Sequence, residues 1–157
     1  MWSCGSASFF FETAGNMASI EEIVREFQGA DRQGMIELLI DYSEGLPEIP
    51  RRFAELADRD LNKVHECETP VFIWVEVKDG KANIFADVPE PFPTVRGLVS
   101  ILVSAFDGLS PEEIESAPVD FISRLGIAQK LGIRRVRGLS AVYARIKSEV
   151  RRHGAVT

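Results

Sequence analysis

The chain has 157 residues, of which 45% are hydrophobic and 27% charged, so it is long enough to bury one core as a single domain. Its two cysteines, Cys4 and Cys67, are too few for a disulfide framework, and two histidines are too few for a structural zinc site. Unpaired cysteines favour a reducing compartment, so we expect a cytoplasmic protein. No apolar run reaches the roughly 18 residues that a membrane-spanning helix needs, so we expect no membrane contact.

Charge is distributed unevenly along the chain. The formal net charge is -6, but residues 1–123 hold 9 basic and 23 acidic side chains, whereas residues 124–157 hold 9 basic and 1 acidic. Clustered arginines are typical of nucleic-acid binding. Here they come without interleaved aromatic residues, and the acidic remainder would repel a polyanion. We therefore expect no nucleic-acid partner, and interpret the basic end as a solvated helix face or a patch for an acidic protein.

The first residues, MWSCGSASFFFETAGN, lack the basic start and the long apolar centre of a secretion signal. We expect residues 1–18 to be a disordered extension, which would make Cys4 incidental. The domain is expected to span residues 19–152 and to be followed by a tail at residues 153–157.

Helical patterns open the domain. A capping box of Ser19 and Glu22 predicts the start of an amphipathic helix. A second helix is expected from Asp31 to about Glu44, and the stiff connector LPEIP then leads to a short helix near residues 51–57. The amino-terminal third is therefore expected to be helical.

The clearest sheet signal is a β-hairpin over about residues 71–88. Apolar residues alternate on both sides of the turn KDGK, and a two-residue loop at Asp79-Gly80 puts Trp74 opposite Phe85. Both faces are apolar near the middle, which predicts helices over one face and partial cover on the other.

Helical patterns return after the hairpin. Residues 95–106 are apolar almost all round and predict a central buried helix. Residues 110–113 form another start signal, two short helical pieces follow, and a final amphipathic helix ends near Arg152. This order predicts a single α+β domain, in which a small antiparallel sheet built on the central hairpin is packed by helices from both ends of the chain.

Cys67 lies between two glutamates in the stretch VHECETPVFIW, directly before the first strand. With His65 and either Glu66 or Glu68 it supplies too few ligands for a closed metal site. A Cys-His hydrolase needs a base within reach of the thiol and an oxyanion hole, and no glycine-rich oxyanion segment lies nearby. Free cysteines are also commonly buried as small hydrophobic residues. From the residues alone, a structural cysteine and a nucleophile stay equally open.

Three segments in this order resemble those of the SufE family, the sulfur acceptors of cysteine desulfurases. VHECETPVFIWVEV resembles the active-cysteine segment, in which a cysteine, Gln or Glu, and Ser or Thr lead into an apolar aromatic strand. VRGL at residues 95–98 and RVRGL at residues 135–139 resemble the openings of the family's central and last helices. The resemblance covers about residues 20–150 and implies the fold that the family shares with IscU-like cluster scaffolds.

The resemblance implies that Cys67 takes up sulfur. A SufS-type cysteine desulfurase, which carries pyridoxal phosphate, leaves sulfur as a persulfide on its own cysteine. Cys67 would accept it, stimulate the desulfurase and relay the sulfur to an iron-sulfur cluster scaffold. The chain would need no cofactor or metal of its own, and would be a transfer partner more than a free-standing enzyme, as a monomer or weak homodimer. Val71, Phe72 and the central helix are expected to shelter the carried sulfur.

Four further residues are candidates for supporting or partner-binding roles. Arg135 matches the arginine of the family's Arg-x-Asn-Gly type segment and would position the loop or dock the desulfurase, with a plain surface arginine as the alternative. Arg137 stands where the family has an amide before Gly138. His65 would relay a proton or merely lie beside the loop. Asp87 lies near a position where the family often has an acidic residue.

A competing hypothesis is a non-catalytic adaptor, whose basic carboxy-terminal helix binds an acidic protein while Cys67 is structural. A cluster scaffold is a third possibility, but it would need several ligating cysteines. Glu66 and Phe72 depart from the family's usual residues around the cysteine, so the identity of the desulfurase stays open. The two flanking glutamates have no explanation at this level.

Overall fold

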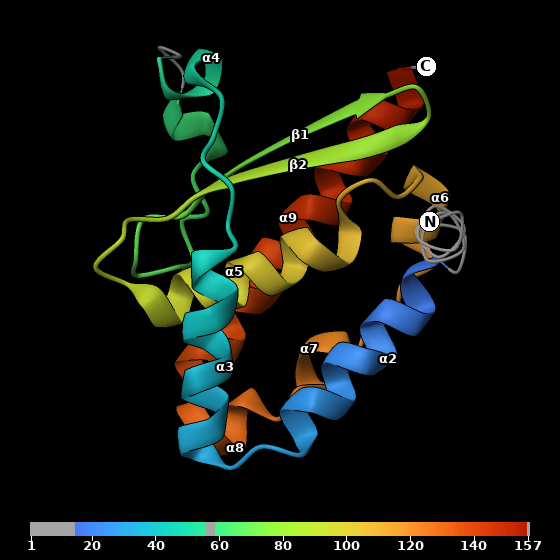
Figure 1. Cartoon of the computed structure of the whole chain (residues 1–157). Coiled ribbons are helices and arrows are strands. Elements are labelled where there is room, and N and C mark those ends of the chain that lie inside the picture. The colour runs from blue at the N-terminus through green and yellow to red at the C-terminus, as the bar shows by residue number, and fades with distance from the viewer. Residues whose placement is uncertain (1–14, 56–58, 157) are drawn as a thin grey trace, which may run out of the picture.

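The computed structural model describes residues 15–55 and 59–156 of the chain (Figure 1). Helices precede and follow one antiparallel hairpin, which confirms the predicted α+β class. The expectations for residues 1–14, including Cys4, lie outside the described residues. In chain order the elements are α2 (Gly15–Gln28), α3 (Arg32–Glu44), α4 (Arg51–Ala54), the 3-10 helix η1 (Arg59–Asn62), β1 (Phe72–Lys78), β2 (Lys81–Asp87), α5 (Pro93–Phe106), α6 (Pro111–Glu115), α7 (Phe121–Arg124), α8 (Ile127–Leu131) and α9 (Ile133–Val156).

The amino-terminal helices follow the predicted order, with corrections to their ends. α2 begins at Gly15, so the predicted cap at Ser19 is wrong; serine and a glutamate three residues later also fit the interior of a helix. α3 begins as predicted, because the Asp31 carboxylate accepts a hydrogen bond of 2.8 Å from the backbone N–H of Gly34. α4 ends at Ala54, short of its predicted end.

β1 and β2 form the predicted hairpin in the predicted register. Trp74 lies opposite Phe85, and Asp79 and Gly80 have positive φ angles of 54° and 76°, as a two-residue type I′ turn requires. α5 and α9 pack against one face of the hairpin (Figure 1). On the other face, the ring of Phe53 in α4 stacks on Trp74 with a centroid distance of 5.3 Å. Helices therefore cover both apolar faces.

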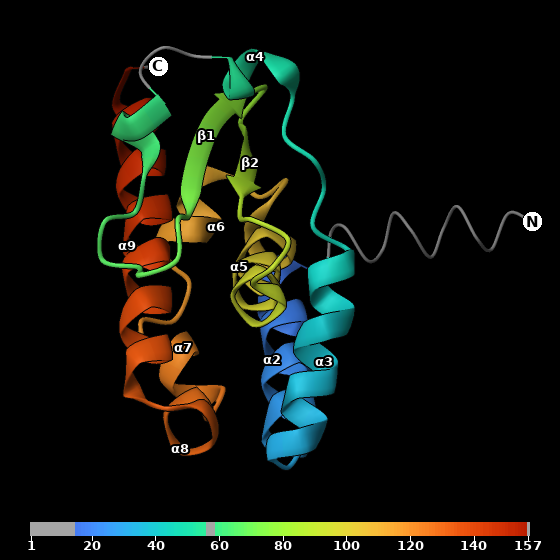
Figure 2. The same cartoon turned by 90° about the vertical axis from the view of Figure 1, so that its left-hand side faces the viewer.

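α5 is the central helix of the core, as its apolar sequence predicts. It lies between α9 on one side and α2 and α3 on the other (Figure 2). α3 approaches closely because residue 97 is glycine: a Cβ there would lie 2.8 Å from the carbonyl carbon of Leu39. Next to it, Arg96 donates hydrogen bonds to the carbonyl oxygens of Val88, at 2.5 Å, and Ser43, at 3.4 Å. Arg96 and Gly97 thus join α5 to α3 and to the chain that leaves β2.

Candidate functional site

The Cys67 loop, residues 63–72, leaves and re-enters the fold at one point. The backbone N–H of Val64 donates a hydrogen bond of 2.8 Å to the carbonyl oxygen of Val71, and both side chains are buried. Just outside this pair, Lys63 and Phe72 form an isolated β-bridge. We call these four residues the neck of the loop and residues 65–70 its tip.

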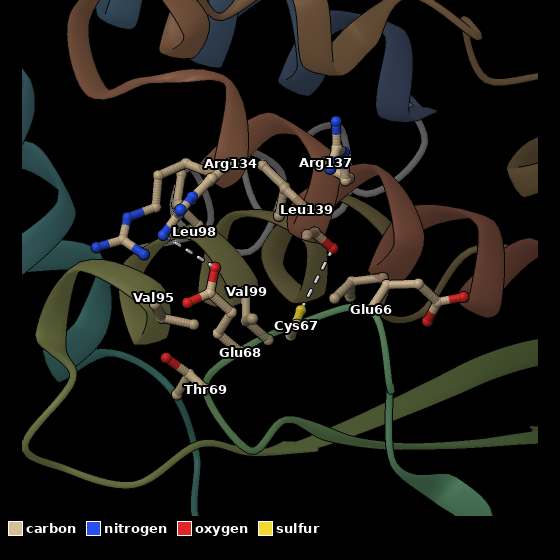
Figure 3. Close-up of a pocket in the computed structure, with 13 residues that line it drawn as sticks. Glu66, Cys67, Glu68, Thr69, Val95, Leu98, Val99, Arg134, Arg137 and Leu139 are labelled. Atoms are coloured by element: carbon tan, nitrogen blue, oxygen red, sulfur yellow. Dashed lines mark hydrogen bonds and ion pairs between the residues drawn. The ribbon is translucent and has the colours of Figure 1, made fainter.

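The Cys67 side chain turns inward from the tip and meets α9. Its Sγ donates a hydrogen bond of 3.4 Å to the carbonyl oxygen of Gly138 (Figure 3). Gly138 is buried, and a Cβ at this position would lie 3.2 Å from the sulfur. The thiol therefore occupies space that the glycine leaves free. The cysteine segment and the RVRGL segment, far apart in the sequence, meet at this contact.

Beside the thiol lies a cavity of about 310 Å³ between the loop, α5 and α9. Val95, Leu98 and Val99 of the central helix line it, as the predicted shelter requires. Val71 and Phe72 are not among its lining residues, so that part of the prediction is wrong. Val71 is fully buried in the neck, and the Phe72 ring stacks on Trp74 in the hairpin.

The other side of the cavity is charged. Glu68 pairs with Arg134, with 3.5 Å between their charged atoms, and both side chains are largely exposed. Arg135 and Arg137 also line the cavity and are exposed, and the labelled Arg137 side chain points away from Cys67 (Figure 3). The cavity thus has an apolar wall beneath the sulfur and arginines at its rim.

The surroundings of Cys67 keep its thiol protonated. Burial, together with the negative charge of Glu66, raises the pKa of Cys67 from its ordinary value of 9.0 to about 11. The guanidinium groups at the rim do not offset this, because they extend into solvent. A neutral thiol can donate a hydrogen bond to Gly138, but it is a poor nucleophile. Glu66, unexplained by the sequence, therefore helps to keep the thiol unreactive in this conformation.

The structure brings together only part of the predicted site. Cys67, Arg135 and Arg137 share the cavity, whereas His65 is exposed and does not line it. Asp87 ends β2, opposite Phe72 in the register, and does not line the cavity either.

Two residues of the site were missed by the sequence reasoning. Arg134 pairs with the loop tip, and the run RRVR was the available signal for it. Gly138 was noted as part of a motif, but nothing in the sequence gave it a contact with the thiol.

Neither a metal centre nor a membrane segment is found among the described residues. No three His, Cys, Asp or Glu side chains there come together to hold a metal ion. No helix in residues 15–55 or 59–156 is long and apolar enough to cross a lipid bilayer. The reactive group that the cavity offers is the Cys67 thiol.

A family model described as SufE, the Fe-S metabolism associated domain, matches residues 21–150. The chain belongs to the SufE family. An uncharacterized SufE-like protein of Mycobacterium tuberculosis is 34% identical over 135 residues, which are 85% of this chain and 92% of that protein. An uncharacterized SufE-like protein of Synechocystis is 28% identical over 132 residues, which are 83% and 79% of the two chains. The solution structure of a hypothetical protein from Thermus thermophilus matches with a TM-score of 0.73 at 27% identity, covering 87% of this chain and 96% of that chain.

The SufE match includes every segment that forms the site. The Cys67 loop, the start of α5 and the start of α9 all lie within the matched residues. The resemblance expected from the sequence is thereby confirmed, and the chain is a SufE-family domain associated with iron-sulfur metabolism.

Proposed function

We propose that this SufE-family chain is a sulfur acceptor, which takes persulfide sulfur from a cysteine desulfurase onto Cys67 and relays it to iron-sulfur cluster assembly. One observation carries the proposal. Cys67, the cysteine of the described residues, lies at a loop tip over an apolar cavity with an arginine rim, in a domain of an iron-sulfur family. The transfer takes place in the cytoplasm, where a free thiol persists.

The proposed transfer is a displacement at sulfur. The Cys67 thiolate attacks the outer sulfur of the desulfurase persulfide and forms a new S–S bond. The S–S bond within the desulfurase persulfide breaks, and the desulfurase cysteine leaves as a thiolate. The outer sulfur keeps its proton or its charge, so no electrons are gained or lost overall. The chain needs no cofactor for this step, and the pyridoxal phosphate belongs to the partner.

Because burial and Glu66 raise the pKa of Cys67 to about 11, we propose that transfer occurs with the loop tip displaced. In the inward position the thiol is neutral and bonded to Gly138. Moving the tip outward removes the burial that raises the pKa and makes the thiolate available to the partner. When the tip returns, the cavity beside Gly138 has room for the added sulfur. The apolar walls of the cavity limit the loss of this sulfur to water and to other thiols.

The arginines at the rim favour an acidic docking surface on the desulfurase. Arg135 and Arg137 have no carboxylate partner among the described residues, and they lie in the first turns of α9. Cations at a helix N-terminus oppose the helix dipole, so these arginines do not stabilise the helix they belong to. Their charge is available to a SufS-type partner, and afterwards to an iron-sulfur scaffold.

The proposal is tested by the rate at which the partner releases alanine from free cysteine. Cys67→Ser removes the acceptor sulfur, so we expect it to abolish the stimulation of the SufS-type desulfurase encoded in the same genome. Cys4→Ser is the matched control and should stimulate as the parent does. Unchanged stimulation by Cys67→Ser would leave the chain a non-catalytic adaptor and end the proposal.

A further inference from the structure

The cysteine segment touches α9 at a second place, on the chain that leads into the neck. Arg145 donates hydrogen bonds to the carbonyl oxygens of Leu61 and of Lys63, the latter at 3.3 Å. Its Nε lies 3.5 Å from the carboxylate of Glu149, one turn further along the helix. The side chains of Arg145 and Glu149 are 25% and 14% exposed. Each of the three nitrogens of this guanidinium therefore has a partner within the protein, whereas Arg135 and Arg137 at the rim have no carboxylate partner among the described residues.

The two contacts lie on one side of one helix. Gly138 and Arg145 are seven residues apart, which is close to two helical turns and about 10 Å along the axis. α9 therefore holds the neck through Arg145 and receives the tip at Gly138 with a fixed spacing. Where the sulfur arrives depends on where the neck is held.

The neck is held more firmly than the tip. The neck is held by the burial of Val64 and Val71, by the hydrogen bond between them, and by the hydrogen bond from Arg145 to Lys63. The tip is held by the thiol hydrogen bond, by a backbone hydrogen bond of 3.2 Å from the N–H of Cys67 to the carbonyl oxygen of Val64, and by the Glu68–Arg134 pair, whose side chains are 76% and 80% exposed. Exposed pairs of this kind contribute little, so the tip opens at a lower free energy than the neck.

We propose that Arg145, backed by Glu149, is the positioning residue of the Cys67 loop. It fixes the neck so that motion is confined to residues 65–70 and the sulfur returns to Gly138 after each excursion. The purpose of this positioning rests on the proposed sulfur transfer. The positioning itself does not depend on that transfer, and it can be tested without a desulfurase.

The test is the alkylation of Cys67 by iodoacetamide as a function of pH, in a Cys4→Ser background in which Cys67 is the sole thiol. With Arg145→Gln we expect the thiol to spend more time outside the cavity. Its apparent pKa then falls from about 11 toward 9, and the rate at pH 8 rises about tenfold for each pKa unit. Exchange of the Val64 amide with solvent should rise in the same variant.

Two controls separate positioning from general destabilisation. Arg151→Gln removes an exposed arginine of the same helix that pairs with Glu115, and it should keep the parent's profile. Ile114→Val destabilises the core at a position away from the loop. Compared at an equal free energy of unfolding with Arg145→Gln, it should leave the pH profile of Cys67 alkylation unchanged.

The outcomes are decisive in both directions. A profile of Arg145→Gln that superimposes on the parent's, or one that Ile114→Val reproduces, overturns the inference. If Arg145→Gln fails to fold, Arg145→Lys keeps the charge with a single donor group, and its rate must lie above the parent's. A shifted profile in a chain that accepts no sulfur would leave the positioning role standing and end only the proposed function.

Discussion

Two segments with nearly the same sequence, VRGL at the start of α5 and RVRGL at the start of α9, do different work. In the first, Arg96 and Gly97 are used inside the fold: the arginine bonds two carbonyl oxygens and the glycine admits a neighbouring helix. In the second, Gly138 admits the sulfur of Cys67 while the arginines face solvent. An arginine-glycine motif can therefore serve helix packing at one helix start and make room for a thiol at another.

The largest expected effect is that of Gly97→Ala. The new Cβ would overlap the backbone of Leu39, which cannot move aside without separating α3 from α5. We expect a loss of about 3 kcal/mol in the free energy of unfolding, measured by urea denaturation. Cys67 in the folded fraction should alkylate at the parent's rate. A loss below about 1 kcal/mol would show that the close helix contact is not needed.

Gly138→Ala should give the converse result. Its Cβ would lie 3.2 Å from the Cys67 sulfur, which belongs to the loop tip that we propose to open. Alanine also favours the helix over glycine, so we expect stability to change by less than about 1 kcal/mol. The displaced thiol should lose its raised pKa, and alkylation should then set in below pH 11 rather than near it. An unchanged pH profile would mean that Gly138 does not hold the thiol.

The smallest effect on stability is expected for the arginines at the rim. Replacing both Arg135 and Arg137 by glutamine removes charges that oppose the dipole of α9, so stability should stay level or rise by about 0.5 kcal/mol. Binding to the desulfurase, followed by calorimetry at several salt concentrations, should weaken and lose part of its salt dependence.

Arg96→Gln is the matched control for that pair. It removes two hydrogen bonds to carbonyl oxygens inside the fold, and it should cost about 1 to 3 kcal/mol without weakening the docking. If the variant that lacks Arg135 and Arg137 destabilised the chain and bound the desulfurase normally, both segments would serve the fold alone, and the contrast drawn between them would be wrong.

Local chemistry explains which features could be predicted from the sequence. The hairpin register followed from Asp79-Gly80 and the alternation around it, because turn and pleat are set by neighbouring residues. The start of α6 followed from its capping box, in which Ser110 and Glu113 bond each other's backbone. The capping-box pattern at Ser19 fitted equally well, but the helix start that it predicted was wrong, because α2 already begins at Gly15.

The features that could not be predicted depend on contacts between distant segments. Arg145 bonds a carbonyl 82 residues away, and the sulfur of Cys67 meets a glycine 71 residues away. No local pattern marks either contact, so the resemblance identified the cysteine but gave neither the protonated state of its thiol nor what holds its loop. Glu68 has its partner Arg134 only because α9 lies beside the loop, whereas Glu66 acts on its sequence neighbour Cys67, whose contact with α9 no local pattern marks.

The most direct test of the account is the mass of the peptide that contains Cys67. The Cys4→Ser chain is incubated with the SufS-type desulfurase and free cysteine, and is then digested without reductant. We predict a gain of one sulfur atom on this peptide that dithiothreitol reverses. A Cys67 peptide of unchanged mass, while the desulfurase itself carries a persulfide, would contradict the account.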